Sequence, residues 1–229
     1  MIRRAMIFAA GRGERMRPLT DATPKPLLRV GGKMLIEHHL EKLAAAGIEE
    51  VVINTSHLAD QFAAALGDGA RWGLRIRYSY EGPQPLETGG GIKHALPLLG
   101  DEPFIAVSAD IVSDYDYARL PVEPEGLAHL VMVPNPAFHP RGDFWLDGDS
   151  LNEDGAGERL TFGNIGVYRP ELVAGEPAER FKLLPAYQRA MRAGRLSGER
   201  HDGSWRNLGT PEQLAELATT IRERPHLSS

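Results

Sequence analysis

Residues 10–17 of the chain read "AGRGERMR" and follow the apolar run "AMIFA". Glycine carries no Cβ, so Gly11 and Gly13 allow a sharp bend and a close approach of the backbone to a ligand. Three arginines add positive charge to the same bend: Arg12, Arg15 and Arg17. Backbone N–H groups beside guanidinium groups suit an oligophosphate. A surface turn with solvated arginines is the alternative that this octapeptide leaves open.

A lysine follows in a constrained loop. Lys25 lies between Pro24 and Pro26, so a stiff backbone aims its side chain. Because three arginines are close in the sequence, we interpret Lys25 as a phosphate-facing residue. A surface lysine in a proline turn is the alternative.

The segment "PLETGGG" places three consecutive glycines, residues 89–91, just before a predicted helix. Such a run costs backbone entropy unless something must approach the main chain closely. A nucleotide base lying over Gly89 and Gly90 supplies a reason, with Glu81 accepting a hydrogen bond from an imide N–H. A plain turn at the start of a helix is the alternative.

Asp110 ends the apolar run "FIAVSAD". A carboxylate at the end of a buried strand must be paired, solvated in a cleft or bound to a metal. Mg²⁺ prefers oxygen ligands and usually takes only one or two from the protein, which suits Asp110. A helix cap is the alternative, and this residue alone does not decide between the two.

Composition limits the class of protein. The chain has 229 residues, 42% hydrophobic and 25% charged, which suits a globular protein of one large α/β domain or two small ones. We favour a single domain over 1–224 with a flexible tail at 225–229. The absence of cysteine excludes disulfides and thiolate nucleophiles. A net charge of −5 argues against nonspecific binding to nucleic acid or to a membrane surface. The apolar runs are too short to span a bilayer and no cleavage site follows the first, so a cytoplasmic protein is expected.

Short apolar runs alternate with helical periodicity, which predicts a parallel sheet covered by helices. The predicted strands of this part are 4–10, 49–55, 74–80 and 103–110, and its predicted helices are 34–47, 58–69 and 91–99. Beyond Asp116 we predict an antiparallel or mixed extension with strands at 127–134, 143–148 and 161–169, then helices at 183–194 and 210–224. Ligands bind at the carboxyl ends of parallel strands. The glycine-rich loop, the triple-glycine segment and Asp110 all follow such strand ends.

The stretch "AMIFAAGRGERMRPLTDATPKPLLRVGGKMLIEHHL" resembles the signature of sugar-1-phosphate nucleotidyltransferases, a G-x-G-x-R-M loop followed by P-K-P. The likeness continues through "PLETGGGIKHALPLLGDEPFIAVSADI" and "LTFGNIGVYRPEL" to "WRNLGTPEQLAEL", and so covers nearly the whole chain. It implies a Rossmann-like α/β fold: a mixed, mostly parallel sheet with helices on both faces. It also implies Mg²⁺-dependent nucleotidyl transfer. Within the family, the most similar group is the short uridylyltransferases of cell-wall recycling, which use UTP and N-acetylmuramate 1-phosphate.

The resemblance also implies roles for individual residues. Arg15 matches the loop arginine that contacts the triphosphate, Lys25 the lysine that bridges phosphate oxygens, and Asp110 the ligand of the catalytic Mg²⁺. The implied nucleotide-binding residues are Ala10, Gly11, Gly13, Glu81, Gly89 and Gly90. The implied sugar-side residues are Asp143, Asn164 and Lys182, although an exposed lysine at a helix start is the alternative for Lys182.

One departure from the family pattern affects the metal. Many relatives carry an aspartate as the second metal ligand, where this chain has Asn207 in "WRNLGT". An asparagine carbonyl oxygen coordinates Mg²⁺ without adding a formal charge. We therefore expect Asp110 and Asn207 as the metal ligands, with Asp110 supplying the charge.

Two other functions stay open. The first is the same chemistry on another hexose 1-phosphate, such as mannose or glucose 1-phosphate. The second is a noncatalytic nucleotide-sugar sensor, which the joint presence of Arg15, Lys25 and Asp110 disfavours. The chain also lacks room for the C-terminal β-helix of longer relatives, so a monomer is expected.

Overall fold

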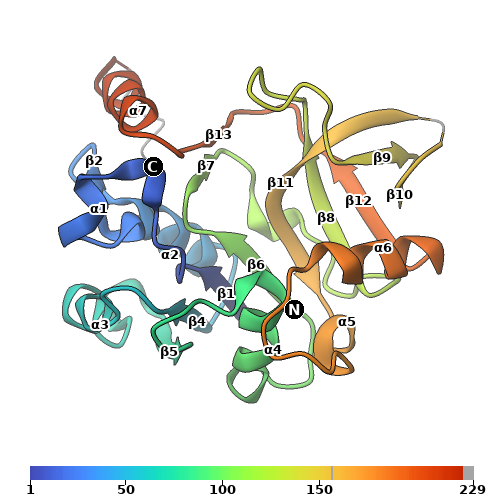
Figure 1. The fold of residues 1–229 in the computed structure, drawn as a ribbon, viewed down its shortest axis with the longest axis horizontal. Helices are drawn as coiled ribbons and strands as arrows, with labels where there is room; N and C mark the ends of the chain where they lie inside the picture. Colours follow the sequence, from blue (N-terminus) through green and yellow to red (C-terminus); the bar gives the residue numbers. More distant parts are fainter. Residues whose placement is uncertain (156, 224–229) are drawn as a thin grey trace.

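A nine-stranded mixed sheet runs through the structure, a computed structural model that describes residues 1–155 and 157–223 (Figure 1). The strand order is β5-β4-β1-β6-β11-β8-β12-β10-β9. The parallel half consists of β1 (Arg4–Phe8), β4 (Glu50–Thr55), β5 (Arg75–Tyr80) and β6 (Phe104–Ser108). The other half consists of β8 (Ala128–Val133), β9 (Phe144–Asp147), β10 (Ser150–Asn152), β11 (Glu158–Tyr168) and β12 (Leu196–Arg200).

The strands of the parallel half lie in register at their carboxyl ends. Phe8 of β1 pairs with Asn54 of β4 on one side and with Ser108 of β6 on the other. The loops that follow these strands therefore leave the sheet at one edge. This edge is where the sequence predicts the site.

The second half is a mixed extension, as predicted. Strand β11 runs antiparallel to β6, β8 and β9, whereas β12 runs parallel to β8. The register of β11 against β8 shifts between Phe162 and Gly166, which marks a β-bulge. The bulge lies toward the end of β11 that is nearest the carboxyl end of β6, because Ile165 pairs with Val107.

Helices cover both faces of the sheet. Ile7 of β1 belongs to a core with α2 (Leu35–Ala45) and α3 (Asp60–Leu66), whereas the adjacent Met6 belongs to a second core. That second core is formed with α4 (Glu87–Leu99), α5 (Glu171–Ala174) and α6 (Leu184–Arg192). Because successive side chains of a strand point to opposite faces, this alternation places the two cores on the two sides of β1. The predicted α/β class, with a mixed sheet and helices on both faces, is therefore confirmed. The sheet is less parallel than predicted, because four of the eight pairings along it are antiparallel.

The last helix returns to the start of the chain. Helix α7 (Pro211–Glu223) packs on β2 (Arg29–Val30), which forms a small hairpin with β3 (Lys33–Met34) (Figure 1). Val30, Leu217 and Ile221 are buried together in a third core. This packing holds the segment before α7 near the predicted site.

Several short elements escape prediction because they are too short to show a period. They are η1 (Glu14–Met16), α1 (Leu19–Ala22), η2 (Lys25–Leu27), η3 (Ala70–Trp72), β7 (Ile111–Ser113), η4 (Tyr117–Arg119) and β13 (Trp205–Asn207). Strands β7 and β13 pair with each other and form a two-stranded ribbon. The predicted boundaries of a domain over 1–224 stay a prediction, and the predicted tail 225–229 lies outside the described residues.

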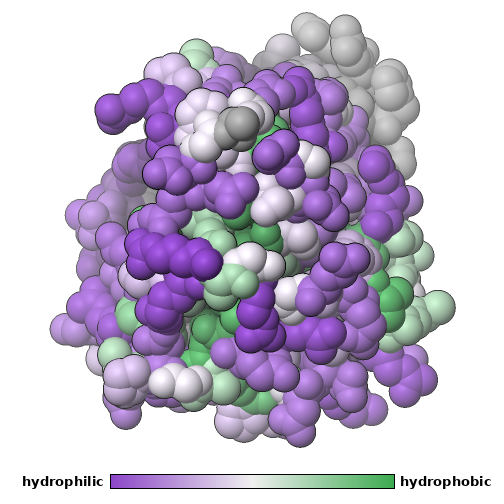
Figure 2. Space-filling view, turned by 90° about the vertical axis from the view of Figure 1, so that its right-hand side faces the viewer, coloured by the Kyte–Doolittle hydropathy of each residue, from purple (hydrophilic) through white to green (hydrophobic). Residues whose placement is uncertain are grey.

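The surface seen in Figure 2 is mostly hydrophilic, and its apolar residues lie in small separate areas. Among the described residues, no helix is both long enough and apolar enough to cross a bilayer. The expected monomer and the expected cytoplasmic location stay predictions.

A buried histidine of α2 makes the fold sensitive to acid. His39 is 2% exposed, and its Nδ1 lies 2.8 Å from the Tyr117 hydroxyl. Burial, followed by the charge of His38, lowers the pKa of His39 from 6.5 to about 4. The unfolded chain therefore takes up a proton below pH 6.5 that the folded protein accepts only near pH 4, so the free energy of unfolding falls as the pH drops through this window.

Prediction: from pH 7.5 to pH 5, the wild type loses about 2 kcal/mol more unfolding free energy than His39→Gln, in which residue 39 no longer titrates. Urea unfolding of both proteins at the two pH values measures the difference. Equal losses in the two proteins would show that His39 is not responsible.

Candidate active site

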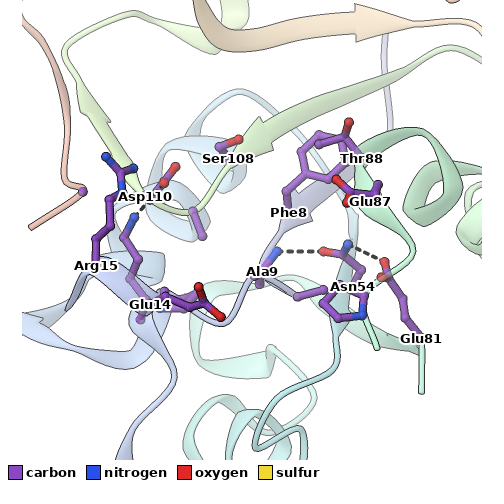
Figure 3. A pocket seen from close by; sticks show the side chains of 18 of the residues that line it. Phe8, Ala9, Glu14, Arg15, Asn54, Glu81, Glu87, Thr88, Ser108 and Asp110 are labelled. Atoms are coloured by element: carbon purple, nitrogen blue, oxygen red, sulfur yellow. Dashed lines mark hydrogen bonds and ion pairs between the residues drawn. The ribbon is translucent and has the colours of Figure 1, made fainter. Parts of the chain in front are cut away.

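A cavity of about 550 Å³ opens at the carboxyl ends of the parallel strands. Its walls come from the loops after β1 and β6, from Asn54 of β4, from residues 81–88 before and in α4, and from Gly209. Figure 3 shows Arg15 and Asp110 on one side of this cavity and Glu87 and Thr88 on the other. The cavity therefore has two ends, and most of the residues predicted for phosphate, metal and base line it.

The glycine-rich loop after β1 lines the cavity with Ala10, Gly11 and Gly13. A Cβ at Gly11 would meet nothing within 4 Å, so this backbone is open to a ligand. Gly13 has φ 65°, and its carbonyl oxygen accepts a hydrogen bond from Thr20 Oγ1 at 2.9 Å. Among the described residues, the amides of Ala10, Gly11 and Arg12 donate to no protein acceptor. Free amides on an exposed loop are suited to phosphate oxygens.

Lys25 and Asp110 meet at one end of the cavity. Lys25 Nζ lies 2.7 Å from Asp110 Oδ2, and the lysine side chain is only 10% exposed against 31% for the aspartate. Lys25 begins η2 right after Pro24, and Asp110 follows β6. A mostly buried ammonium needs such a partner. The structure thus joins two residues that are predicted separately from the sequence.

Arg15 lies at the same end of the cavity. Its guanidinium packs against Gly209, where a Cβ would come within 2.9 Å of Arg15 Nη2. Leu208, the residue before, donates its amide hydrogen to the carbonyl oxygen of Asp110 at 2.8 Å. Gly209 therefore leaves room for the Arg15 guanidinium to approach the backbone closely, a contact that the sequence did not suggest.

Only one of the three arginines of the bend reaches the cavity. Arg15 and Lys25 line the cavity, but Arg12 and Arg17 do not. Arg17 forms an exposed ion pair with Asp21 at 3.1 Å. The reason is η1: Met16 is fully buried in this single turn, so its neighbours Arg15 and Arg17 point in different directions.

A buried hydrogen-bond network joins the strand ends at the cavity floor. Asn54 Oδ1 accepts from the Ala9 amide at 2.7 Å, and Asn54 Nδ2 donates to Glu81 Oε1 at 2.6 Å (Figure 3). Glu81 Oε2 accepts from the Leu86 amide at 2.7 Å. Glu81 lines the cavity, but its two oxygens already accept hydrogen bonds within the protein, one from Asn54 of β4 and the other from the loop before α4. Sequence reasoning missed Asn54, which looks like an ordinary strand residue in "VVINT".

The predicted contact of a base with Gly89 and Gly90 is not supported, because both glycines are buried inside α4 and neither lines the cavity. Their amides donate to the Phe181 carbonyl oxygen, at 3.0 Å each. A Cβ at Gly90 would overlap the carbonyl oxygen of Glu179. These glycines thus admit a second segment, residues 179–183, rather than a ligand. That segment brings Arg180 to the cavity, a residue that sequence reasoning missed.

Asn207 provides a test of the predicted metal site. It pairs with Ile111, the residue after Asp110, and its side-chain Oδ1 is buried without a hydrogen-bond partner. Buried acceptors are rarely left unpaired, so this oxygen fits a cation ligand. Among the described residues, no group of three His, Cys, Asp or Glu side chains could hold a metal. One carboxylate and one amide oxygen match the small protein share that Mg²⁺ requires.

The three predicted sugar-side residues lie outside the cavity lining. Both Asp143 oxygens are engaged, Oδ2 by the Phe162 amide at 2.8 Å and Oδ1 by His139 Nε2 at 3.0 Å. Asn164 has φ 57° in the bulge of β11, and Lys182 is exposed. Asp143 thus stabilises the bulge, and direct sugar contacts by these residues stay a prediction.

The chain belongs to the nucleotidyl transferase family, whose sequence profile matches residues 4–123. This span includes the glycine-rich loop, Lys25 and Asp110. A protein of Neisseria meningitidis serogroup B named N-acetylmuramate alpha-1-phosphate uridylyltransferase is 48% identical, and the match covers 93% of this chain and 96% of that protein. A protein of the same name from Caulobacter vibrioides is 39% identical over 95% of this chain and 96% of its own length.

Another relative matches only about half of the chain. Mannose-1-phosphate guanylyltransferase of Mycobacterium tuberculosis is 40% identical, but the match covers 51% of this chain and 32% of that protein. Among solved structures, a Bacillus anthracis protein in complex with sucrose has a TM-score of 0.82 at 18% identity, covering 97% of this chain and 96% of its own. HddC from Yersinia pseudotuberculosis, complexed with GMP-PN, has a TM-score of 0.76 at 20% identity, covering 96% and 100%. These two structures confirm the fold.

Prediction: Gly90→Ala displaces the segment 179–183 and lowers the free energy of unfolding by about 1–3 kcal/mol, because the new Cβ meets backbone atoms that cannot move independently. Gly11→Ala is the matched control, since its Cβ meets nothing within 4 Å, and it should change stability by less than about 0.5 kcal/mol. Urea unfolding measures both. Equal stability of the two variants would refute the packing role of Gly90.

Proposed function

We propose that this protein transfers a uridylyl group from UTP to the phosphate of N-acetylmuramate 1-phosphate and releases pyrophosphate. The observation that carries the proposal is the cavity end where Arg15, Lys25 and Asp110 come together. The donor and acceptor are proposed from the 48% identical relative named for this reaction, which matches over nearly its whole length. A cytoplasmic location follows as a prediction, because the reaction uses UTP.

The chemistry needs positioning and charge stabilisation rather than a general base. The attacking phosphate oxygen is already anionic near neutral pH, and it attacks the α-phosphorus of UTP in line with the departing pyrophosphate. Two anions must therefore be held together while charge builds on the transferred group. Arg15 and the free amides of the glycine-rich loop suit the triphosphate, and Lys25 suits oxygens near the reacting phosphorus.

The cavity alone does not supply enough positive charge. Its lining contains three cationic side chains, Arg15, Lys25 and Arg180, and four anionic ones, Glu14, Glu81, Glu87 and Asp110. Members of this family generally use a divalent metal ion. We propose Mg²⁺ held by Asp110 and Asn207; when bound, it would neutralise phosphate charge and polarise the phosphorus. Lys25 would then exchange its contact with Asp110 for one with phosphate.

Prediction: Asp110→Ala and Arg15→Ala each lower turnover by about 10²-fold or more, as expected for loss of one preorganised electrostatic group. The control is Arg17→Ala, which removes an exposed arginine two residues from Arg15 that does not line the cavity. Near-normal turnover in both site variants would remove the proposed mechanism.

Pyrophosphate release is measured over a matrix of nucleoside triphosphates and sugar 1-phosphates, with and without Mg²⁺. The proposal requires UTP with N-acetylmuramate 1-phosphate to give the highest rate. A higher rate with mannose or glucose 1-phosphate would favour the other hexose reaction. No release in any combination would favour a sensor.

Prediction: Asn207→Ala raises the Mg²⁺ concentration for half-maximal activity several-fold, because a neutral oxygen ligand is lost, whereas Asn207→Asp lowers it by adding charge. Binding of Mn²⁺, measured by electron paramagnetic resonance, should be weaker in Asn207→Ala and tighter in Asn207→Asp than in the wild type. Identical metal titrations in all three proteins would exclude Asn207 as a ligand.

A further inference from the structure

Arg180 is a cation of the cavity for which the transfer chemistry gives no role. Lys25 is bonded to Asp110, and Arg15 lies against Gly209, so both belong to the reacting end. Arg180 instead pairs with Glu87, with 3.4 Å between Nη2 and Oε1. Figure 3 shows Glu87 beside Thr88 on the side of the cavity opposite Arg15 and Asp110. The cavity thus offers a separate positive charge at its far end.

The backbone that carries Arg180 is firmly held. The Phe181 carbonyl oxygen accepts two hydrogen bonds from the first turn of α4, and the Phe181 amide donates to the Leu86 carbonyl oxygen at 3.2 Å. Two residues on, the Leu183 amide donates to Thr88 Oγ1 at 3.1 Å. A recognition group on such a fixed segment needs little further ordering when a ligand binds.

The guanidinium itself remains available. The Arg180 and Glu87 side chains are 58% and 38% exposed, and exposed ion pairs of this kind contribute little free energy. The contact uses a single guanidinium nitrogen, whereas an arginine presents five N–H donors in a planar fork that matches a carboxylate. A carboxylate on a ligand can therefore replace or join Glu87.

Glu87 is placed to release Arg180. It is the first residue of α4 and has φ 66°, a strained value for a residue with a side chain. A carboxylate in the first turn of a helix is stabilised by the helix dipole there. Glu87 therefore keeps a favourable environment when Arg180 turns to a ligand.

The proposed acceptor carries two anions. Its phosphate, on the anomeric carbon, must lie at the reacting end near Lys25 and Asp110. Its second anion is the carboxylate of the lactyl ether on C3, which the sugar ring holds away from the phosphate. A carboxylate drawn into a cavity needs a cationic partner or several hydrogen bonds. Of the cations lining the cavity, Arg180 is the one at the far end.

We propose that Arg180 binds the lactyl carboxylate of N-acetylmuramate 1-phosphate and thereby selects this sugar over the same sugar without the lactyl group. The inference rests on the proposed function. It assigns a specificity role to a residue that neither the glycine-rich loop nor the metal site includes.

The test compares N-acetylmuramate 1-phosphate with N-acetylglucosamine 1-phosphate, which lacks only the lactyl group, in the wild type and in Arg180→Met. Pyrophosphate release with UTP and Mg²⁺ is the readout; where turnover of the second sugar is below detection, its inhibition constant against the first is used. For the lactyl sugar, kcat/KM should fall about 10- to 100-fold, mainly through KM, as for loss of a charged hydrogen bond. For the other sugar, the change should be less than about threefold.

Two variants complete the design. Arg192→Met removes a comparable arginine that does not line the cavity and that pairs with Glu153 at a distance of 2.9 Å. This variant should leave kcat/KM unchanged for both sugars. Arg180→Lys keeps the charge and should retain part of the preference for the lactyl sugar. If thermal unfolding shows that Arg180→Met is misfolded, Arg180→Lys replaces it in the test: a reduced preference supports the inference, and an unchanged preference overturns it.

Each contrary outcome has its own meaning. An equal loss for both sugars in Arg180→Met would assign Arg180 to the shared phosphate and overturn the inference, and so would unchanged kinetics. A wild type that does not use N-acetylmuramate 1-phosphate would refute the proposed function, and the inference with it. Loss of selectivity in Arg180→Met but not in Arg192→Met, together with an active wild type, supports both the inference and the proposed function.

Discussion

The contact between Lys25 and Asp110 ties together the two loops on which the site depends. The lysine belongs to the loop system that follows β1, and the aspartate follows β6, the adjacent parallel strand. Each charge is partly buried, so each needs the other when no ligand is present. Because Phe8 and Ser108 lie side by side in the sheet, the pairing of two strands is enough to bring these loops to one edge. The same contact is well suited to exchange, since a phosphate can attract the lysine and a divalent ion can attract the aspartate.

Glycines of this site serve two different physical purposes. Gly11 leaves the backbone open toward the cavity, where nothing would meet a Cβ. Gly90 and Gly209 instead admit close neighbours, a second chain segment in one case and an arginine in the other. The first purpose serves ligand binding directly. The second lets the segment that carries Arg180 pack closely on α4 and lets the Arg15 side chain approach Gly209, so cations at both ends of the cavity lie against glycines.

Much of the fold could be predicted from the sequence because its central strands and helices are long enough to show a period. Strand β1 and helix α2, for example, lie where the apolar patterns place them, and the loops after the strands carry Arg15, Lys25 and Asp110 to one edge. The rest depends on contacts between distant parts of the chain. Asn54 and Arg180 carry no local signal, and Gly89 and Gly90 of α4 are explained by a segment far along the chain. The direction of Arg17 was missed because a single buried methionine sets it.

The central claim is that the cavity beside Lys25 and Asp110 gathers the triphosphate, the divalent ion and the acceptor phosphate. A crystal structure with a nonhydrolysable UTP analogue and Mg²⁺ tests it most directly. The account predicts the triphosphate inside this cavity in contact with Arg15 and the glycine-rich loop, the metal on Asp110, and Lys25 turned from Asp110 to phosphate. A nucleotide bound elsewhere, with the contact between Lys25 and Asp110 unchanged, would contradict it.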